Sequence, residues 1–120
     1  MATTYKKGDA DTRPWGTWEV LESSNNYCVK RICVTPGSIL SLQMHHHRSE
    51  HWIIVEGEAT VTLGDEEIIK KADESIYTPI GTKHRIKNST NRDMIFIEIQ
   101  TGNSLDECDI VRLEDAYGRV

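Results

Sequence analysis

The stretch SLQMHHHRSEHW, from Ser41 to Trp52, holds four of the five histidines of the chain. A glutamine precedes them, and Glu50 stands among them. The stretch lies between segments that read as β-strand, well away from either terminus. Imidazole nitrogens together with amide and carboxylate oxygens are ligands for divalent first-row metal ions. The stretch therefore suggests a metal site that is held on strands.

Spacing selects four of these donors. Gln43 and His45 share one strand face, about 7 Å apart along the strand, and two ligands of one ion can close that distance. Glu50 stands at the start of the next strand, and His84 follows the turn PIGTKH. Strand alternation turns His46 and His51 away, which predicts surface or interface positions for both. The predicted ligand set is Gln43, His45, Glu50 and His84, with water in the open positions.

The elements that must position these donors read as strands. Short β-rich runs alternate with turns that contain glycine, proline or asparagine, as in antiparallel sandwiches and barrels. The expected strands are Thr17–Leu21, Tyr27–Val34, Leu40–His45, His51–Val55, Ala59–Leu63, Glu67–Lys70, Ser75–Thr78, His84–Lys87 and Met94–Thr101. Residues 1–12 are polar and expected to be loose, residues 13–120 form one domain, and Leu105–Tyr117 is open to a short helix.

Two of these strands have one wholly apolar face and one face that carries polar groups. The faces with polar groups are those of Ser41, Gln43 and His45 in one strand and of Phe96, Glu98 and Gln100 in the other. Such a face either meets solvent or lines a cavity, and periodicity alone does not decide between the two.

Composition excludes several classes of protein. The 120 residues carry a net charge of -5 and no basic run, which argues against a nucleic-acid partner. The three cysteines are an odd number without CxxC spacing, so a disulfide framework is not expected. The sequence has neither a signal-like apolar region nor a run of membrane-spanning length, so we expect no membrane partner and place the protein in the cytoplasm.

Two spaced motifs resemble those of the cupin superfamily. The pattern G-x5-H-x-H-x4-E-x6-G is matched from Gly37 to Gly57, with Gln43 in the place of the first histidine. The pattern G-x5-P-x-G-x2-H-x3-N is matched from Pro79 to Asn88, with Asp73 in the place of its glycine. The resemblance implies an all-β, cupin-type antiparallel β-barrel, or jelly roll, with a metal ion inside.

Five longer segments are similar to the C-terminal domain of type II mannose-6-phosphate isomerases. They are RPWGTWEVLE, LSLQMHHHRSEHW, YTPIGTKHRIKN, IEIQTG and DIVRLEDAYGR. The resemblance implies a metal-dependent isomerase of a small phosphorylated sugar in mannose and GDP-mannose metabolism, and cupin domains often form homodimers. Zinc is the first choice of metal, with cobalt, manganese, nickel or iron as alternatives. No Gly-rich nucleotide loop is present, so nucleotidyl transfer is not expected of this chain.

Such an isomerase needs a base that moves a proton between C1 and C2. Glu98 is the first candidate, because its strand face also carries Gln100, and Lys30 and His47 are alternatives. A structural ion pair is the competing interpretation of Glu98. Arg48, Arg85 and Lys83 lie beside the ligands in sequence and are the candidates for binding the phosphate. Tyr77 and Gln100 are candidates for the substrate wall.

Two other functions compete with the isomerase. One is a non-catalytic cupin that binds a sugar phosphate and partners a separate guanylyltransferase. The other is an oxygenase of the cupin type, which Gln43 disfavours because an amide is a poorer donor than histidine for iron(II).

Overall fold

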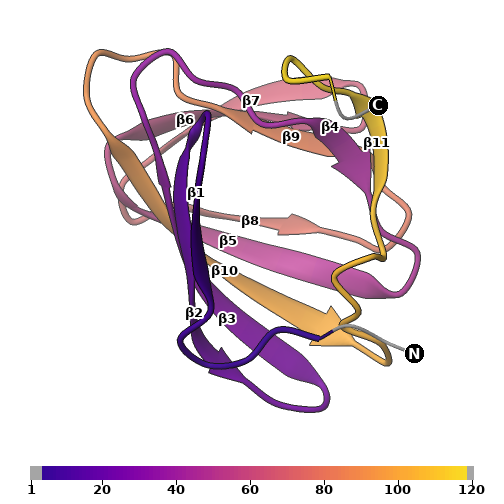
Figure 1. Cartoon of the computed structure of the whole chain (residues 1–120). Coiled ribbons are helices and arrows are strands. Elements are labelled where there is room, and N and C mark those ends of the chain that lie inside the picture. The colour runs from indigo at the N-terminus through magenta and orange to yellow at the C-terminus, as the bar shows by residue number, and fades with distance from the viewer. Residues whose placement is uncertain (1–3, 119–120) are drawn as a thin grey trace.

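The computed structural model describes residues 4–118, and these form strands and loops without a helix. One antiparallel sheet contains, in spatial order, β1 (Ala10–Arg13), β2 (Gly16–Ser23), β3 (Tyr27–Val34), β10 (Met94–Gly102), β5 (Arg48–Glu56) and β8 (Ser75–Thr78). The other contains β11 (Val111–Glu114), β4 (Leu42–Met44), β9 (His84–Lys87), β6 (Glu58–Leu63) and β7 (Glu66–Lys71). The two sheets face each other (Figure 1), which confirms the predicted all-β barrel. No described segment is a helix of the length and apolarity that a membrane span requires.

Most expected strands are present, and three have the predicted bounds. The strand expected at His51 begins earlier, at Arg48, so that Glu50 lies inside β5 rather than before it. The strand expected over Leu40–His45 is only three residues long.

Both ends of the chain differ from expectation. Residues 10–13, mostly within the segment expected to be loose, form β1, which pairs with β2, and Thr4 bridges Asp106. All four side chains of β1 are exposed because it is an edge strand, so its sequence lacks the apolar alternation that marks a strand. The segment that was open to a helix contains β11 instead, which pairs with β4.

The space between the sheets is divided into an apolar end and a polar end. In β10 the inward residues are Met94 and Phe96 and then Glu98 and Gln100, all buried. The neighbouring strands change at the same level, because Phe96 pairs with Ile32 whereas Glu98 pairs with Lys30. The apolar end consists of Ile32, Val34, Trp52, Ile54, Ala59, Val61, Ile86, Met94 and Phe96. The polar end consists of Lys30, His45, Arg48, Glu50, His84, Glu98 and Gln100.

Two backbone positions hold strand ends in place. Gly16 begins β2 so close to β3 that a Cβ atom there would lie 1.9 Å from the carbonyl oxygen of Cys33. Asp73 has a φ of 75°, in the left-handed region that glycine adopts most readily, and its N–H donates to the carbonyl oxygen of Ile54. The glycine of the second cupin motif falls at this position, and aspartate is one of the few other residues that tolerate the conformation.

Candidate metal centre

Both sheets contribute to the polar end. Gln43 of β4 pairs directly with His84 of β9 in one sheet. Glu50 of β5 pairs with Gln100 of β10 in the other. His45 follows β4 and is also buried. The polar strand faces therefore line the interior, which decides between the two interpretations that periodicity left open.

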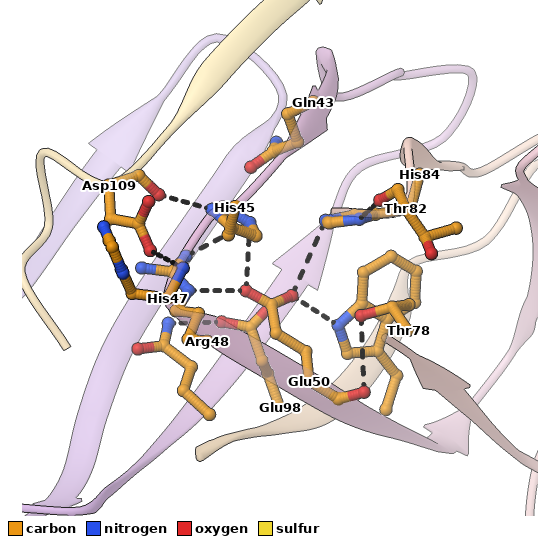
Figure 2. A network of polar contacts seen from close by, with 12 residues as sticks. Gln43, His45, His47, Arg48, Glu50, Thr78, Thr82, His84, Glu98 and Asp109 are labelled. Atoms are coloured by element: carbon orange, nitrogen blue, oxygen red, sulfur yellow. Dashed lines mark hydrogen bonds and ion pairs between the residues drawn. The ribbon is translucent and has the colours of Figure 1, made fainter. Parts of the chain in front are cut away.

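Three buried side chains meet in a group that could hold a metal ion. His45, Glu50 and His84 each offer a ligand atom, and these atoms lie within 4.8 Å of one another. The Nε2 atom of His45 is 3.2 Å from one carboxylate oxygen of Glu50, and that of His84 is 3.8 Å from the other. Figure 2 shows both rings turned toward the carboxylate. Two imidazoles and a carboxylate are a common donor set for divalent metals, so the residues fit such an ion.

Hydrogen bonds fix which nitrogen of each ring faces the centre. The Nδ1 atom of His45 is 2.6 Å from the carbonyl oxygen of Asp109, and that of His84 is 3.0 Å from the carbonyl oxygen of Thr82. A carbonyl oxygen only accepts, so Nδ1 carries the proton in both rings. Both Nε2 atoms then carry the lone pair that a cation would bind, with Nη2 of Arg48 3.4 Å from Nε2 of His45, and the rings are held in orientation.

Gln43 lies at the same site but makes a different contact. Its amide nitrogen donates to the hydroxyl of Ser41 at 3.0 Å, which leaves the amide oxygen as the group available to the interior. In Figure 2 the side chain lies above His45 on the side of the group away from Glu50. Gln43 lines the same cavity as Glu50.

Glu50 is ionised in this environment. Burial alone would raise the pKa of its carboxyl group, but His45, Arg48 and His84 together hold the pKa well below its usual value. Arg48 donates from Nε to the Glu50 carboxylate at 2.9 Å, and the indole of Trp52 donates to the other oxygen at 2.9 Å. Burial lowers the pKa of His84, which favours the neutral ring that a metal requires.

Glu98 differs from Glu50, although both are buried. Burial and the nearby charge of Glu50 raise the pKa of Glu98 to about 7, because the opposing charges of Lys30 and Arg48 do not compensate fully. Gln100 donates to Glu98 at 2.8 Å. The two carboxyl groups of this cavity thus have well-separated pKa values. Such a separation is common in sites where two carboxyl groups have different roles.

Lys30 lies directly opposite Glu98 across the β3–β10 pair and is also buried. Its ammonium group lies 3.5 Å from the ring centroid of Tyr5 and 4.7 Å from that of Trp18. These cation–π contacts stabilise the charged lysine inside the barrel. The side chains of Tyr5, Trp18 and Lys30 form one wall of a cavity of about 140 Å³ that also reaches Glu50 and Glu98.

Three predicted site residues lie elsewhere, and a fourth, Arg85, lines a smaller cavity with Gln43, Glu50 and other site residues. His47 is exposed, and its contact to Asp109 comes from its backbone N–H. Tyr77 is 47% exposed and packs against His51 on the outer face of its sheet, so it is no wall of this cavity. Lys83 pairs with Asp65 at the surface. Arg85 donates from Nε to the carbonyl oxygen of Leu40, so much of its hydrogen-bonding capacity serves the fold.

The structure adds residues that the sequence did not single out. The carboxylate of Asp109 accepts from the backbone N–H groups of His46 and His47, at 2.8 and 2.9 Å. Arg13 and Arg112 line the same cavity as Glu50. All three fall in segments that resemble the isomerase family, but nothing in their local patterns points to a cavity. Pairing of β1 with its neighbour β2 places Arg13, and the long-range pairing of β11 with β4 places Arg112.

A family model described as mannose-6-phosphate isomerase C-terminal matches residues 3–115. The xanthan biosynthesis protein XanB of Xanthomonas campestris is 51% identical over 107 residues, which are 89% of this chain and 23% of that protein. The mannose-1-phosphate guanylyltransferase ManC of Salmonella typhimurium is 47% identical over 108 residues, which are 90% of this chain and 22% of that protein. The chain thus spans about a quarter of the length of these relatives.

Solved structures with the same fold are more distant in sequence. The capsular polysaccharide assembling protein CapF of Staphylococcus aureus superposes with a TM-score of 0.76 at 22% identity, covering 88% of this chain and 34% of that one. A cupin-superfamily sugar phosphate isomerase of Silicibacter pomeroyi superposes with a TM-score of 0.64 at 20% identity, covering 71% and 58%. At these identities the comparison establishes the cupin fold.

Proposed function

The chain belongs to the mannose-6-phosphate isomerase C-terminal family, and we propose on that basis that it interconverts mannose 6-phosphate and fructose 6-phosphate with a bound divalent metal ion. The observation that carries the proposal is the buried group of His45, Glu50 and His84 beside the second carboxyl group of Glu98. The ion would be held by His45, Glu50 and His84, with Gln43 as the fourth donor, and zinc is the first choice. When bound, such an ion supplies positive charge that stabilises the oxyanion of an enediolate.

The protein side chains divide the remaining work. Glu98 takes the proton from C2 of the open-chain aldose and returns it to C1, while the hydroxyl proton of O2 passes to O1, so the product is the ketose. A pKa of about 7 suits a group that must both accept and release a proton near neutral pH, although a bound cation lowers it. Gln100 fixes the carboxyl group by its 2.8 Å hydrogen bond. The exposed position of His47 disfavours it as the base.

The test is a coupled assay for fructose 6-phosphate with protein that has been loaded with zinc, cobalt or manganese. The Glu98→Gln variant should lose about 10²–10⁴-fold in kcat and keep its metal content, because the side chain acts as base and not as ligand. Glu50→Gln should lose both metal and turnover. Glu67→Gln, on the exposed face of β7, is the matched control and should behave as wild type. Absence of turnover in the wild type with all three metals would reject the isomerase.

A second function has one observation in its favour. The chain covers only 22% of ManC, which is named a guanylyltransferase, so it corresponds to one part of a larger enzyme. A cupin that binds a sugar phosphate and assists a separate guanylyltransferase would show a rise in melting temperature with mannose 6-phosphate and no turnover. Turnover by the chain alone removes this alternative.

The homodimer expected from the sequence remains a prediction. Several large apolar side chains on the outer face of the six-stranded sheet are exposed, among them Ile53, Val55 and Tyr77. Such a face suits a contact with a second copy. Light scattering after size exclusion, on wild type and on Val55→Glu, tests this, and a monomeric wild type would reject it.

A further inference from the structure

The cavity at the polar end is locally rich in positive charge, although the protein as a whole is negative. Its lining includes the cations Arg13, Lys30, Arg48 and Arg112. The lining carboxyl groups are Glu50, Glu98 and Glu107, so the cations outnumber them by four to three. A bound divalent cation would add to the positive side, so the cavity favours an anion against the overall charge of -5.

Arg48 has a donor that no protein group uses. The side chain is 6% exposed, its Nε donates to Glu50, and its Nη1 is buried without a hydrogen-bond partner. A buried charged donor without an acceptor costs more than an ordinary unmade hydrogen bond. Because Arg48 lines the cavity, an anion bound there would supply the missing acceptor.

Two further arginines approach the same cavity from opposite ends of the chain. Arg112 of β11 pairs directly with Gln43 of β4, so it stands next to the candidate metal ligands. Arg13 ends β1 and reaches the cavity while it pairs with Asp11 at 3.3 Å. Guanidinium groups bind phosphate in the bidentate way that lysine does not provide.

Resting on the isomerase function, we propose that Arg13, Arg48 and Arg112 form the site that binds the phosphate group of the substrate. This assignment replaces Lys83, which pairs with Asp65 at the surface and does not line the cavity. It also replaces Arg85, which lines a smaller cavity and donates from Nε to the carbonyl oxygen of Leu40. The sugar carbons then extend from the arginines toward Glu98 and the metal ligands, along the wall of Tyr5 and Trp18.

The experiment compares ligands with and without a phosphate on metal-loaded wild type, Arg13→Gln and Arg112→Gln. Calorimetric titration with fructose 6-phosphate should give Kd values raised about 10-fold or more in each variant, because each loses a charge-assisted hydrogen bond. Inorganic phosphate should compete with fructose 6-phosphate less well in the variants. The ratio of the Kd for unphosphorylated fructose to the Kd for fructose 6-phosphate should fall in each variant, because only the phosphate contacts the arginines.

The controls separate this site from general charge and from folding. Arg92→Gln, at an exposed turn position outside the cavity, and Lys83→Gln should both leave the Kd for fructose 6-phosphate unchanged. Arg13 is 45% exposed, so its replacement tests the site even where Arg112→Gln folds poorly. Melting temperature and metal content of each variant are measured alongside.

The outcomes distinguish the phosphate site from the isomerase. If the wild type binds fructose 6-phosphate and the arginine variants bind it weakly, the site stands, whether or not the wild type turns substrate over. If Arg13→Gln binds fructose 6-phosphate as tightly as wild type does, or loses phosphorylated and unphosphorylated ligands alike, the assignment is overturned. A wild type that binds neither fructose 6-phosphate nor inorganic phosphate overturns it as well.

Discussion

The two ends of the barrel interior are built from the same strands but serve different purposes. Along β10, Met94 and Phe96 pack into an apolar cluster, and two pleats further on Glu98 and Gln100 take part in a hydrogen-bonded network. Along β5, Ile54 and Trp52 give way to Glu50 and Arg48 in the same manner. Burial of apolar surface at one end stabilises the fold. That stability offsets the cost of holding several charged groups in the interior at the other end.

The largest effect should come from the apolar end. Phe96→Ala removes a fully buried ring and should lower the free energy of unfolding by about 3–5 kcal/mol. Ile97→Ala, on the half-exposed outer face of the same strand, should cost only about 1 kcal/mol. Urea denaturation measures both. Equal losses would mean that the inner and outer faces of β10 contribute alike to the free energy of unfolding. The apolar end would then not be the main source of stability.

Metal should stabilise the polar end. With free zinc at 100 times its Kd, the folded state should gain about 2.7 kcal/mol, which in a chain of this size corresponds to a rise of about 10 °C in melting temperature. The rise should persist in Ile97→Ala and vanish in His45→Ala. Differential scanning calorimetry with and without a chelator measures it. An undiminished rise in His45→Ala would place the ion somewhere other than the polar end.

A smaller effect should come from the hydrogen bonds of Asp109 that hold the turn next to the candidate ligand His45. Asp109→Asn replaces one of the two oxygens that accept from His46 and His47 by an NH2 group, which disturbs the turn that carries His45. We expect a loss of about 10-fold in metal affinity with an altered cobalt absorption spectrum. Asp65→Asn at the surface is the control. Unchanged affinity and spectrum in Asp109→Asn would show that the C-terminal segment covers the site without orienting it.

The smallest expected change in stability concerns the turn at Asp73, whose N–H donates to the carbonyl oxygen of Ile54 at the apolar end. Asp73 occupies a left-handed backbone position, so Asp73→Gly should be at least as stable as wild type. Asp73→Ala should be about 1 kcal/mol less stable than the glycine variant, because its Cβ meets the full strain of that conformation. Thermal unfolding of the two variants measures the difference, and equal stabilities would mean that the turn relaxes.

Local sequence patterns predicted an antiparallel sandwich or barrel, because strand alternation and turn residues are properties of short segments, and the resemblance to cupins selected the barrel. The buried group of His45, Glu50 and His84 follows from the cupin-like spacing of these residues, and their convergence in the structure agrees with that expectation. Their role as ligands stays a prediction. Periodicity alone could not show that the polar face of β10 lies inside, because alternation defines two faces without orienting them.

The residues that were misplaced or missed have two main causes, which are strand alternation and contact between segments far apart in the chain. Neighbourhood in sequence suggested Lys83 for the phosphate, yet its side chain points to the surface and pairs with Asp65. Tyr77 lies on the outer face for the same reason that Thr78 is buried, since adjacent strand residues alternate. Asp109 and Arg112 were missed because contacts of the C-terminal segment with β4 and the residues after it bring them to the site. Arg13 was missed because the exposed β1 has no strand-like alternation.

The central position of β10 between β3 and β5 also determines when the site can exist. Lys30 and Glu98 meet only after the whole chain from β4 to β9 has been made and the long loop between β3 and β10 has closed, which makes such pairings slow. During synthesis on the ribosome, the chain therefore has no cavity until its last quarter has emerged. A nascent or truncated chain ending before β10 would lack Glu98 and leave the interior edges of β3 and β5 open, so the cavity cannot close before this strand has joined the sheet.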